Sequence, residues 1–80
     1  MEVSLSGPVR EAADGLASIE IEASTIRELL ERLTDRYPKM ARQMEQGIAV
    51  SINGTIYRDS WNTPIPEDAE VYLIPRIAGG

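Results

Sequence analysis

The sequence contains no cysteine and no histidine. Without cysteine there can be no disulfide, thiol nucleophile, persulfide or thiolate metal site. Without histidine, the side chain that most often serves as general base and metal ligand is missing as well. Catalysis by this chain alone would depend on carboxylates, lysine, tyrosine or hydroxyl groups, and no set of nucleophile, base and oxyanion donors is visible. We therefore expect neither an independent enzyme nor a metal site.

The chain also lacks a long apolar run and has few basic residues. No stretch approaches the roughly 20 apolar residues that cross a bilayer, and the N-terminus does not resemble a signal peptide. Eight basic against thirteen acidic side chains give a net charge of −5, which repels nucleic acid and anionic membranes. We expect a cytoplasmic protein with no nucleic-acid or membrane partner. The negative charge serves solubility or steers the protein toward a basic surface on a partner protein.

What is present fits one small globular domain. The sequence is 42% hydrophobic and 26% charged, which is typical of a folded domain. A length of 80 residues is too short for two hydrophobic cores. We predict one domain over residues 1–75, followed by a flexible C-terminal tail over residues 76–80.

The first half of the chain predicts a hairpin and a helix. Alternation predicts strands over residues 1–6 and 19–23, separated by a loop from Gly7-Pro8 to about Ser18. Thr25 and Glu28 match a capping box in which each side chain accepts from the other's backbone N–H. The apolar face of the helix that follows ends near Tyr37. A second, shorter helical segment stops near Gly47. It carries two methionines that are suited to core packing, Met40 and Met44.

The second half predicts the remaining strands. Strands over residues 48–52 and 55–57 flank Asn53-Gly54, a strong hairpin signal. A loop over residues 59–69 follows, with Trp61 and Ile65 as its expected core anchors. We assign Trp61 and Tyr57 to packing rather than to a ligand platform. A last strand over residues 70–74, closed by Pro75, completes an α+β, ubiquitin-like β-grasp roll. This roll has a mixed sheet of four to five strands with one main helix packed on one face. The first strand should pair in parallel with either the third strand or the last strand.

The chain ends on Gly79-Gly80. Two glycines can enter a narrow slot that would reject even a methyl group. The carboxylate is a poor electrophile, but a partner that transfers AMP to it creates a mixed anhydride open to attack by sulfur or an amine. The alternative is a frayed chain end without a function.

Three segments resemble the MoaD/ThiS family of prokaryotic sulfur carriers, most closely MoaD. The helix resembles the family's T-[VI]-x-E-L-L-x-x-L…Y-P stretch, and residues 48–54 resemble its strand and turn. Residues 63–80, TPIPEDAEVYLIPRIAGG, resemble its T-P-L-x-x-G-D-E-V-x-x-x-P-P-[VI]-A-G-G ending. This chain departs from the pattern at Ala69, where the family has glycine, and at Arg76, where it has a second proline.

The resemblance implies a carrier without a permanently bound cofactor, similar to the small subunit of molybdopterin synthase. Its Gly80 carboxylate would be adenylylated by an E1-like adenylyltransferase that uses ATP. A sulfur donor would then convert it to a thiocarboxylate, which a downstream sulfur-accepting synthase consumes. The acceptor pathway stays open, because thiamine, tRNA thiolation and cysteine synthesis use similar carriers.

The predicted site therefore centres on the end of the chain. Gly80 carries the chemistry with Gly79 beside it, and the expected partner contacts are Tyr72, Ile74, Pro75, Arg76, Ile77 and Ala78. The acidic residues of the turn before the last strand are assigned to solvent rather than to a metal, namely Glu67, Asp68 and Glu70. Two other functions stay open. One is a ubiquitin-like modifier joined to lysines through Gly80, and the other is a non-covalent interaction module.

Overall fold

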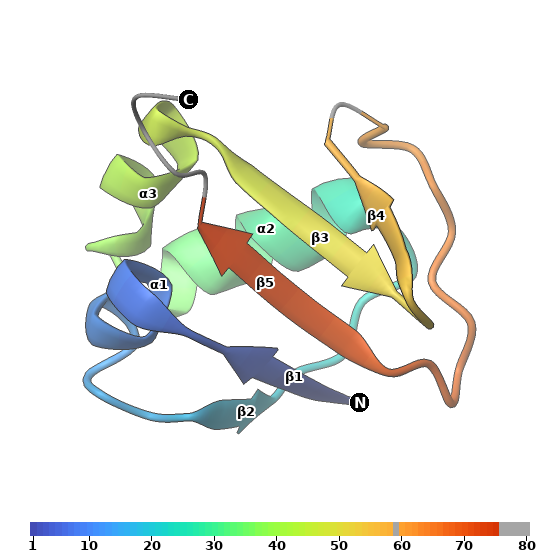
Figure 1. Ribbon diagram of the computed structural model, residues 1–80, viewed down its shortest axis with the longest axis horizontal. Helices are drawn as coiled ribbons and strands as arrows, with labels where there is room; N and C mark the ends of the chain where they lie inside the picture. Colours follow the sequence, from blue (N-terminus) through green and yellow to red (C-terminus); the bar gives the residue numbers. More distant parts are fainter. Residues whose placement is uncertain (59, 76–80) are drawn as a thin grey trace.

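The computed structural model describes residues 1–58 and 60–75. Five strands of these residues form one mixed sheet in the order β2-β1-β5-β3-β4, in which β1 and β5 are parallel and the other neighbours antiparallel (Figure 1). This topology confirms the predicted β-grasp fold, with the last strand rather than the third beside the first. The elements are β1 (Glu2–Leu5), α1 (Gly7–Ala12), β2 (Ser18–Glu20), α2 (Ile26–Arg36), α3 (Met40–Gln46), β3 (Ile48–Ile52), β4 (Thr55–Tyr57) and β5 (Val71–Pro75).

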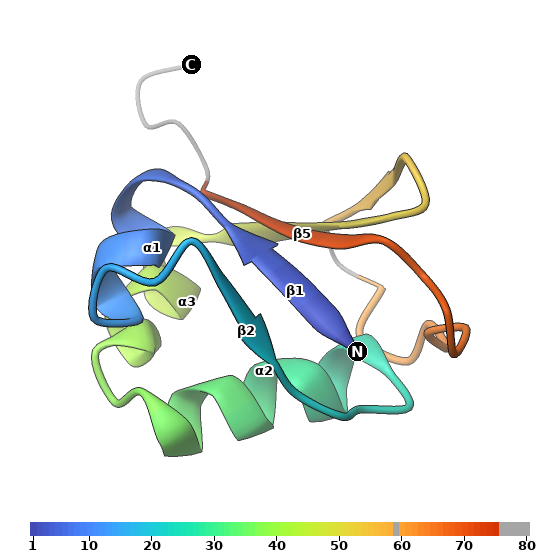
Figure 2. The same ribbon diagram turned by 90° about the horizontal axis from the view of Figure 1, so that it is seen from below.

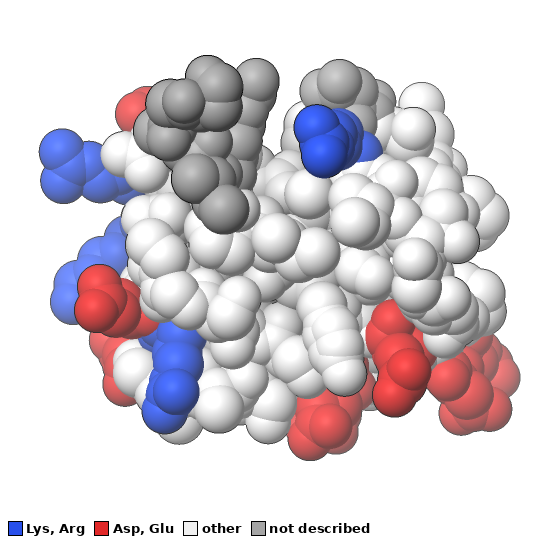
Figure 3. All heavy atoms as spheres, viewed as in Figure 1, with Lys and Arg blue, Asp and Glu red and all other residues white. Residues whose placement is uncertain are grey.

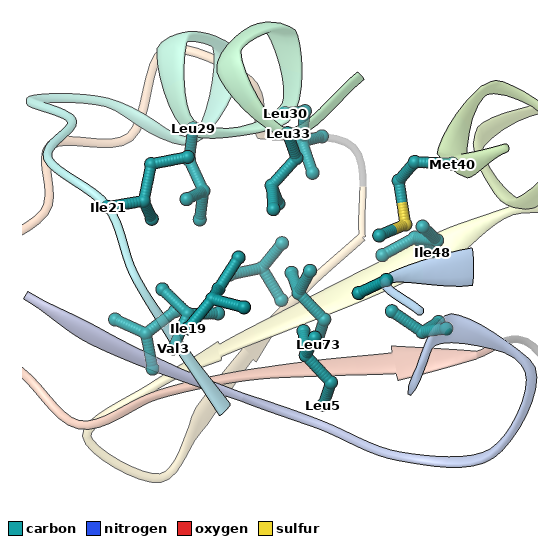
Figure 4. Close-up of a cluster of buried hydrophobic side chains, with 14 of the residues drawn as sticks. Val3, Leu5, Ile19, Ile21, Leu29, Leu30, Leu33, Met40, Ile48 and Leu73 are labelled. Atoms are coloured by element: carbon teal, nitrogen blue, oxygen red, sulfur yellow. The ribbon is translucent and has the colours of Figure 1, made fainter. Parts of the chain in front are cut away.

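The helices cover one face of the sheet and leave the other bare. Helix α2 crosses below the sheet in Figure 2, while α1 and α3 lie at the end where β5 finishes. The core fills the space between α2 and the strands (Figure 4), and it includes Val3, Leu29, Leu33, Met40 and Leu73, each at most 1% exposed. Met40 and the partly buried Met44 take the packing roles expected of them.

The start of α2 follows its sequence signal with one difference. The Thr25 hydroxyl accepts the backbone N–H of Glu28 at 3.2 Å, as expected for an N-cap. The Glu28 carboxylate, however, accepts from the N–H of Ser24 at 2.9 Å, not from that of Thr25 as predicted. The cap therefore reaches one residue further back along the chain.

The loop predicted after Gly7-Pro8 is wrong, because this segment contains α1. Proline is tolerated in the first turn of a helix, where its missing N–H has no helical partner to lose. Val9, Ala12 and Ala13 then recur at helical spacing and are all buried. Strand β2 is correspondingly shorter than predicted, although Ile21 beyond it still donates its N–H to the Met1 carbonyl at 3.0 Å.

The β3–β4 turn confirms the hairpin prediction, since Asn53 and Gly54 have φ values of 51° and 88°. Of the two residues expected to anchor the following loop, Ile65 is buried but Trp61 is 38% exposed. The loop is instead held by its backbone, because the Trp61 carbonyl accepts the N–H of Arg27 at 2.8 Å. The ring is therefore free to stay at the surface.

Candidate functional site

The central strand β5 presents two different faces. Val71 and Leu73 are each 1% exposed and point into the core, whereas Tyr72 is 43% exposed and Ile74 is half-buried. The alternation of side chains along a strand places Tyr72 and Ile74 on the side away from α2. The structure therefore places Tyr72 and Ile74, two of the expected partner contacts, on the face of the sheet opposite the helices.

Strand pairing joins these residues to neighbours on the bare side of the sheet. Tyr72 lies opposite Ser4 on β1 and Ser51 on β3, and Ser51 lies opposite Ile56 on β4. In the next row Ile74 lies opposite Ala49. We call this surface the outer face, and it comprises Ser4, Ala49, Ser51, Ile56, Tyr72 and Ile74.

Ile56 is the residue of the outer face that sequence reasoning missed. It is 53% exposed, more than any other large apolar side chain in the part of the chain that the structure describes. The sequence feature that could have identified Ile56 is the two-residue turn, because it fixes the register of β3 against β4 and so places Ile56 opposite Ser51. A tyrosine and an isoleucine on an uncharged surface are typical of a protein-docking patch.

None of the six residues of the outer face is charged, and the nearest charged residue on the same side of β1 is Glu2, two positions before Ser4. In Figure 3, charged side chains lie toward the margins of the view, whereas the centre of the view, over β5 and β3, is uncharged. The shifted pKa values belong to the far end of the sheet. There, hydrogen bonds to Glu22 (2.8 Å) and Glu20 (3.1 Å) raise the pKa of the Met1 ammonium, and the same ammonium lowers the pKa of Glu22.

The predicted tail contacts begin at Pro75. Pro75 is half-buried, pairs with Ile48 and continues the inward series of Val71 and Leu73, so its ring lies on the side of α1 rather than on the outer face. The other predicted residues lie outside the described residues, namely Arg76, Ile77, Ala78, Gly79 and Gly80.

Two surface hollows lie away from the outer face. One, of about 410 Å³, is lined by Met1, Ala69 and four acidic side chains, and the other, of about 310 Å³, lies between Arg27 and the loop around Trp61.

Residues 1–58 and 60–75 contain no group of three carboxylates placed to hold a metal ion. The acidic residues 67, 68 and 70 are exposed, as predicted. Within the same ranges, no helix has both the length and the apolar composition to cross a membrane.

The sheet order and the helix packed beneath it define a ubiquitin-like β-grasp protein. The chain belongs to the ThiS family, whose family model matches residues 3–80. It thus has the fold of the ThiS and MoaD sulfur carriers. A comparison with curated proteins gave no match.

Solved structures support the fold. Small archaeal modifier protein 1 from Methanosarcina acetivorans is similar with a TM-score of 0.80 at 24% identity, covering 99% of this chain and 94% of that one. A putative molybdopterin converting factor subunit 1 from Pyrococcus furiosus gives 0.78 at 20% identity, covering 95% of each. A chain of the BexX/CysO complex from Amycolatopsis orientalis gives 0.77 at 22% identity, covering 99% and 98%. At these identities the likeness concerns the fold.

Proposed function

We propose that this protein is a sulfur carrier that acts through the carboxylate of Gly80. An E1-like enzyme adenylylates the carboxylate with ATP, a sulfur donor converts it to a thiocarboxylate, and a downstream synthase takes the sulfur. The observation that carries the proposal is membership of the ThiS family over residues 3–80, a range that includes Gly79 and Gly80. The need for ATP fits the cytoplasmic location predicted from the sequence.

The proposed chemistry requires little of the chain itself. A Gly80 carboxylate oxygen attacks the α-phosphorus of ATP, and pyrophosphate leaves. Hydrosulfide from the sulfur donor then attacks the carbonyl carbon, the C–O bond to AMP breaks, and AMP leaves with the bonding pair, so the thiocarboxylate forms without a change of oxidation state. The partner supplies the catalytic groups, which agrees with the lack of cysteine and histidine in this chain. The chain supplies the carboxylate and a surface that brings it to the partner, so we propose no catalytic role for its folded domain.

The outer face is the proposed docking surface. Tyrosine is enriched at the energetic centres of interfaces, and charged residues are depleted there. Tyr72 and Ile74 lie on β5 itself, whose last residue, Pro75, precedes the tail directly. A partner that binds the outer face therefore holds the strand from which the tail starts. Arg76, Ile77 and Ala78 are the proposed contacts beyond it.

Similarity to a molybdopterin converting factor subunit and to CysO in complex with BexX supports a protein partner downstream. We propose a molybdopterin synthase large subunit as the first acceptor to test. A second candidate function is protein modification, which the similarity to small archaeal modifier protein 1 favours. The two functions share the activation of Gly80 and differ in the final nucleophile, which is sulfur in one and a lysine amine in the other.

The test is the intact mass of the protein isolated from its host, and again after incubation with ATP, sulfide and the host's E1-like enzyme. We expect a species with one oxygen replaced by sulfur at Gly80, and none in a chain that lacks Gly79 and Gly80. Lysine conjugates without any thiocarboxylate would favour the modifier. An unmodified mass in both samples would contradict activation altogether and leave a non-covalent module.

A further inference from the structure

The sequence contains a single lysine. Seven of its eight basic side chains are arginines, and Lys39 alone carries an amine. A guanidinium does not lose its proton in a protein, so arginine is unable to attack an activated acyl group. A hydroxyl group needs a general base before it attacks, and histidine, the commonest such base, is missing. Within this sequence, the amines able to compete with sulfur for an activated carboxylate are therefore Lys39 and the amino group of Met1.

The amino group of Met1 is already engaged. It donates hydrogen bonds to the carboxylates of Glu22 at 2.8 Å and Glu20 at 3.1 Å. These two carboxylates stabilise the ammonium and raise its pKa, whereas an amine attacks only after it has lost its proton. The Met1 side chain is 4% exposed, and its carbonyl accepts the N–H of Ile21 at 3.0 Å. The structure therefore disfavours Met1 as an acceptor.

Lys39 is accessible. It is exposed and lies in the turn from α2 to α3, on the helix side of the sheet (Figure 2). The backbone of this turn is fixed, because Met40 is 0% exposed and its N–H donates to the Tyr37 carbonyl at 2.8 Å. Among the residues that the structure describes, Lys39 forms no ion pair. The outer face lies on the opposite side of the sheet, so a partner docked there leaves the amine of Lys39 open.

We propose that Lys39 is a modification site, to which a second copy of this chain is joined through its Gly80 when no sulfur nucleophile reaches the adenylate. The inference rests on the proposed activation of Gly80 by ATP. Nζ of Lys39 attacks the carbonyl carbon of the adenylate and a C–N bond forms. The C–O bond to AMP breaks, AMP leaves with the bonding pair, and the amine releases a proton to solvent.

The donor and the acceptor are separate copies, so the reaction does not depend on how the tail lies on its own domain. Each copy offers one acceptor amine, and the conjugate therefore has one type of linkage. Hydrosulfide and Lys39 compete for the same carbonyl carbon. Conjugation should accordingly increase when sulfur is short and decrease when it is plentiful.

The experiment compares the wild type with Lys39→Arg, which keeps the positive charge and removes the amine. Each chain is incubated with ATP and the host's E1-like enzyme, with and without sulfide. We expect both chains to release pyrophosphate. Without sulfide, the wild type should give a species with the mass of two chains less one water, which sulfide suppresses and Lys39→Arg does not form. Trypsin cleaves after arginine but not after an acylated lysine, so the linkage should appear as residues 37–42 carrying residues 77–80 as a branch.

Three results would overturn the inference. They are pyrophosphate release by the wild type without sulfide and without a conjugate, an equal amount of conjugate from Lys39→Arg, and a single chain one water lighter, which places the bond within one copy. If the wild type releases no pyrophosphate, the proposed function fails. The reactivity of Lys39 is then decided by a measurement that needs no enzyme.

That measurement uses the N-hydroxysuccinimide ester of acetyl-Gly-Gly in limiting amount at neutral pH. We expect acylation of Lys39 in the wild type and loss of acylation in Lys39→Arg. Adding Glu20→Gln and Glu22→Gln to Lys39→Arg releases the amino group of Met1, and acylation should return at that group. Equal acylation of Met1 and Lys39 in the wild type would refute the assignment of Lys39 as the acceptor.

Discussion

Replacing Tyr72 by alanine should weaken binding to the activating enzyme without unfolding the domain. Tyr72 is 43% exposed, and a tyrosine can bury roughly 200 Å² in all, so docking would remove about 90 Å² more from water. At about 25 cal/mol per Å² this is about 2 kcal/mol, or about thirtyfold in Kd. The loss in folding stability should be small, because the side chain lies outside the core.

Trp61→Ala is the matched control for this variant. Trp61 is also a half-exposed aromatic residue, at 38%, but it lies in the hollow beside Arg27 at the start of α2 rather than on the outer face. Isothermal titration of each variant against the E1-like enzyme gives the Kd, and urea unfolding gives the stability. The argument for the outer face is refuted if Trp61→Ala weakens binding as much as Tyr72→Ala, or if Tyr72→Ala binds like the wild type.

Three further predictions concern the scaffold. Leu33→Ala should lower the free energy of unfolding by about 3 kcal/mol, measured in urea, because Leu33 is fully buried. Thr25→Ala should cost about 1 kcal/mol in the same assay through loss of the cap to Glu28. The lowered pKa of Glu22 contributes folding stability that is present above pH 4.5, the ordinary pKa of the group, and is lost as the pH falls through its pKa in the folded protein. The raised pKa of the Met1 ammonium contributes folding stability that is complete below pH 8.0, the ordinary pKa of that group, and is lost as the pH rises through its pKa in the folded protein. Glu22→Gln should therefore flatten the pH dependence of unfolding in both ranges, and an unchanged curve would contradict the ion pair.

The sequence predicts those parts of the fold that are determined by residues close together in the chain. The N-cap at Thr25, the Asn53-Gly54 turn and the last strand each depend on neighbouring residues and are confirmed, whereas the Glu28 half of the capping box bonds to Ser24 instead of Thr25. Helix α1 was missed because Gly7-Pro8 signals a break, while the buried spacing of Val9 with the alanines after it signals a helix. The exposure of Trp61 was missed because it depends on where distant backbone bonds hold the loop.

The same distinction applies to the candidate site. Tyr72 and Ile74 follow from alternation within one strand, so the sequence identifies their side of the sheet. The position of Ile56 in the same row as Tyr72 depends instead on the pairing of β3 with β5, two strands that are not consecutive in the chain. Such contacts are set by topology rather than by local pattern. The roles of residues 76–80 stay predictions.

The surface of the sheet has features that oppose contact between copies of the chain. Exposed apolar patches and unpaired strand edges both favour contact between copies. At the β2 edge, α2 protects the backbone: Arg36 donates to the carbonyl of Glu20 at 2.8 Å and Arg32 to that of Glu22 at 2.6 Å. A net charge of −5, carried by residues other than the six of the outer face, adds repulsion between copies at long range. Under the proposed function the same charge attracts a partner with a basic rim, so we expect one distribution of charge to oppose self-association and to favour docking.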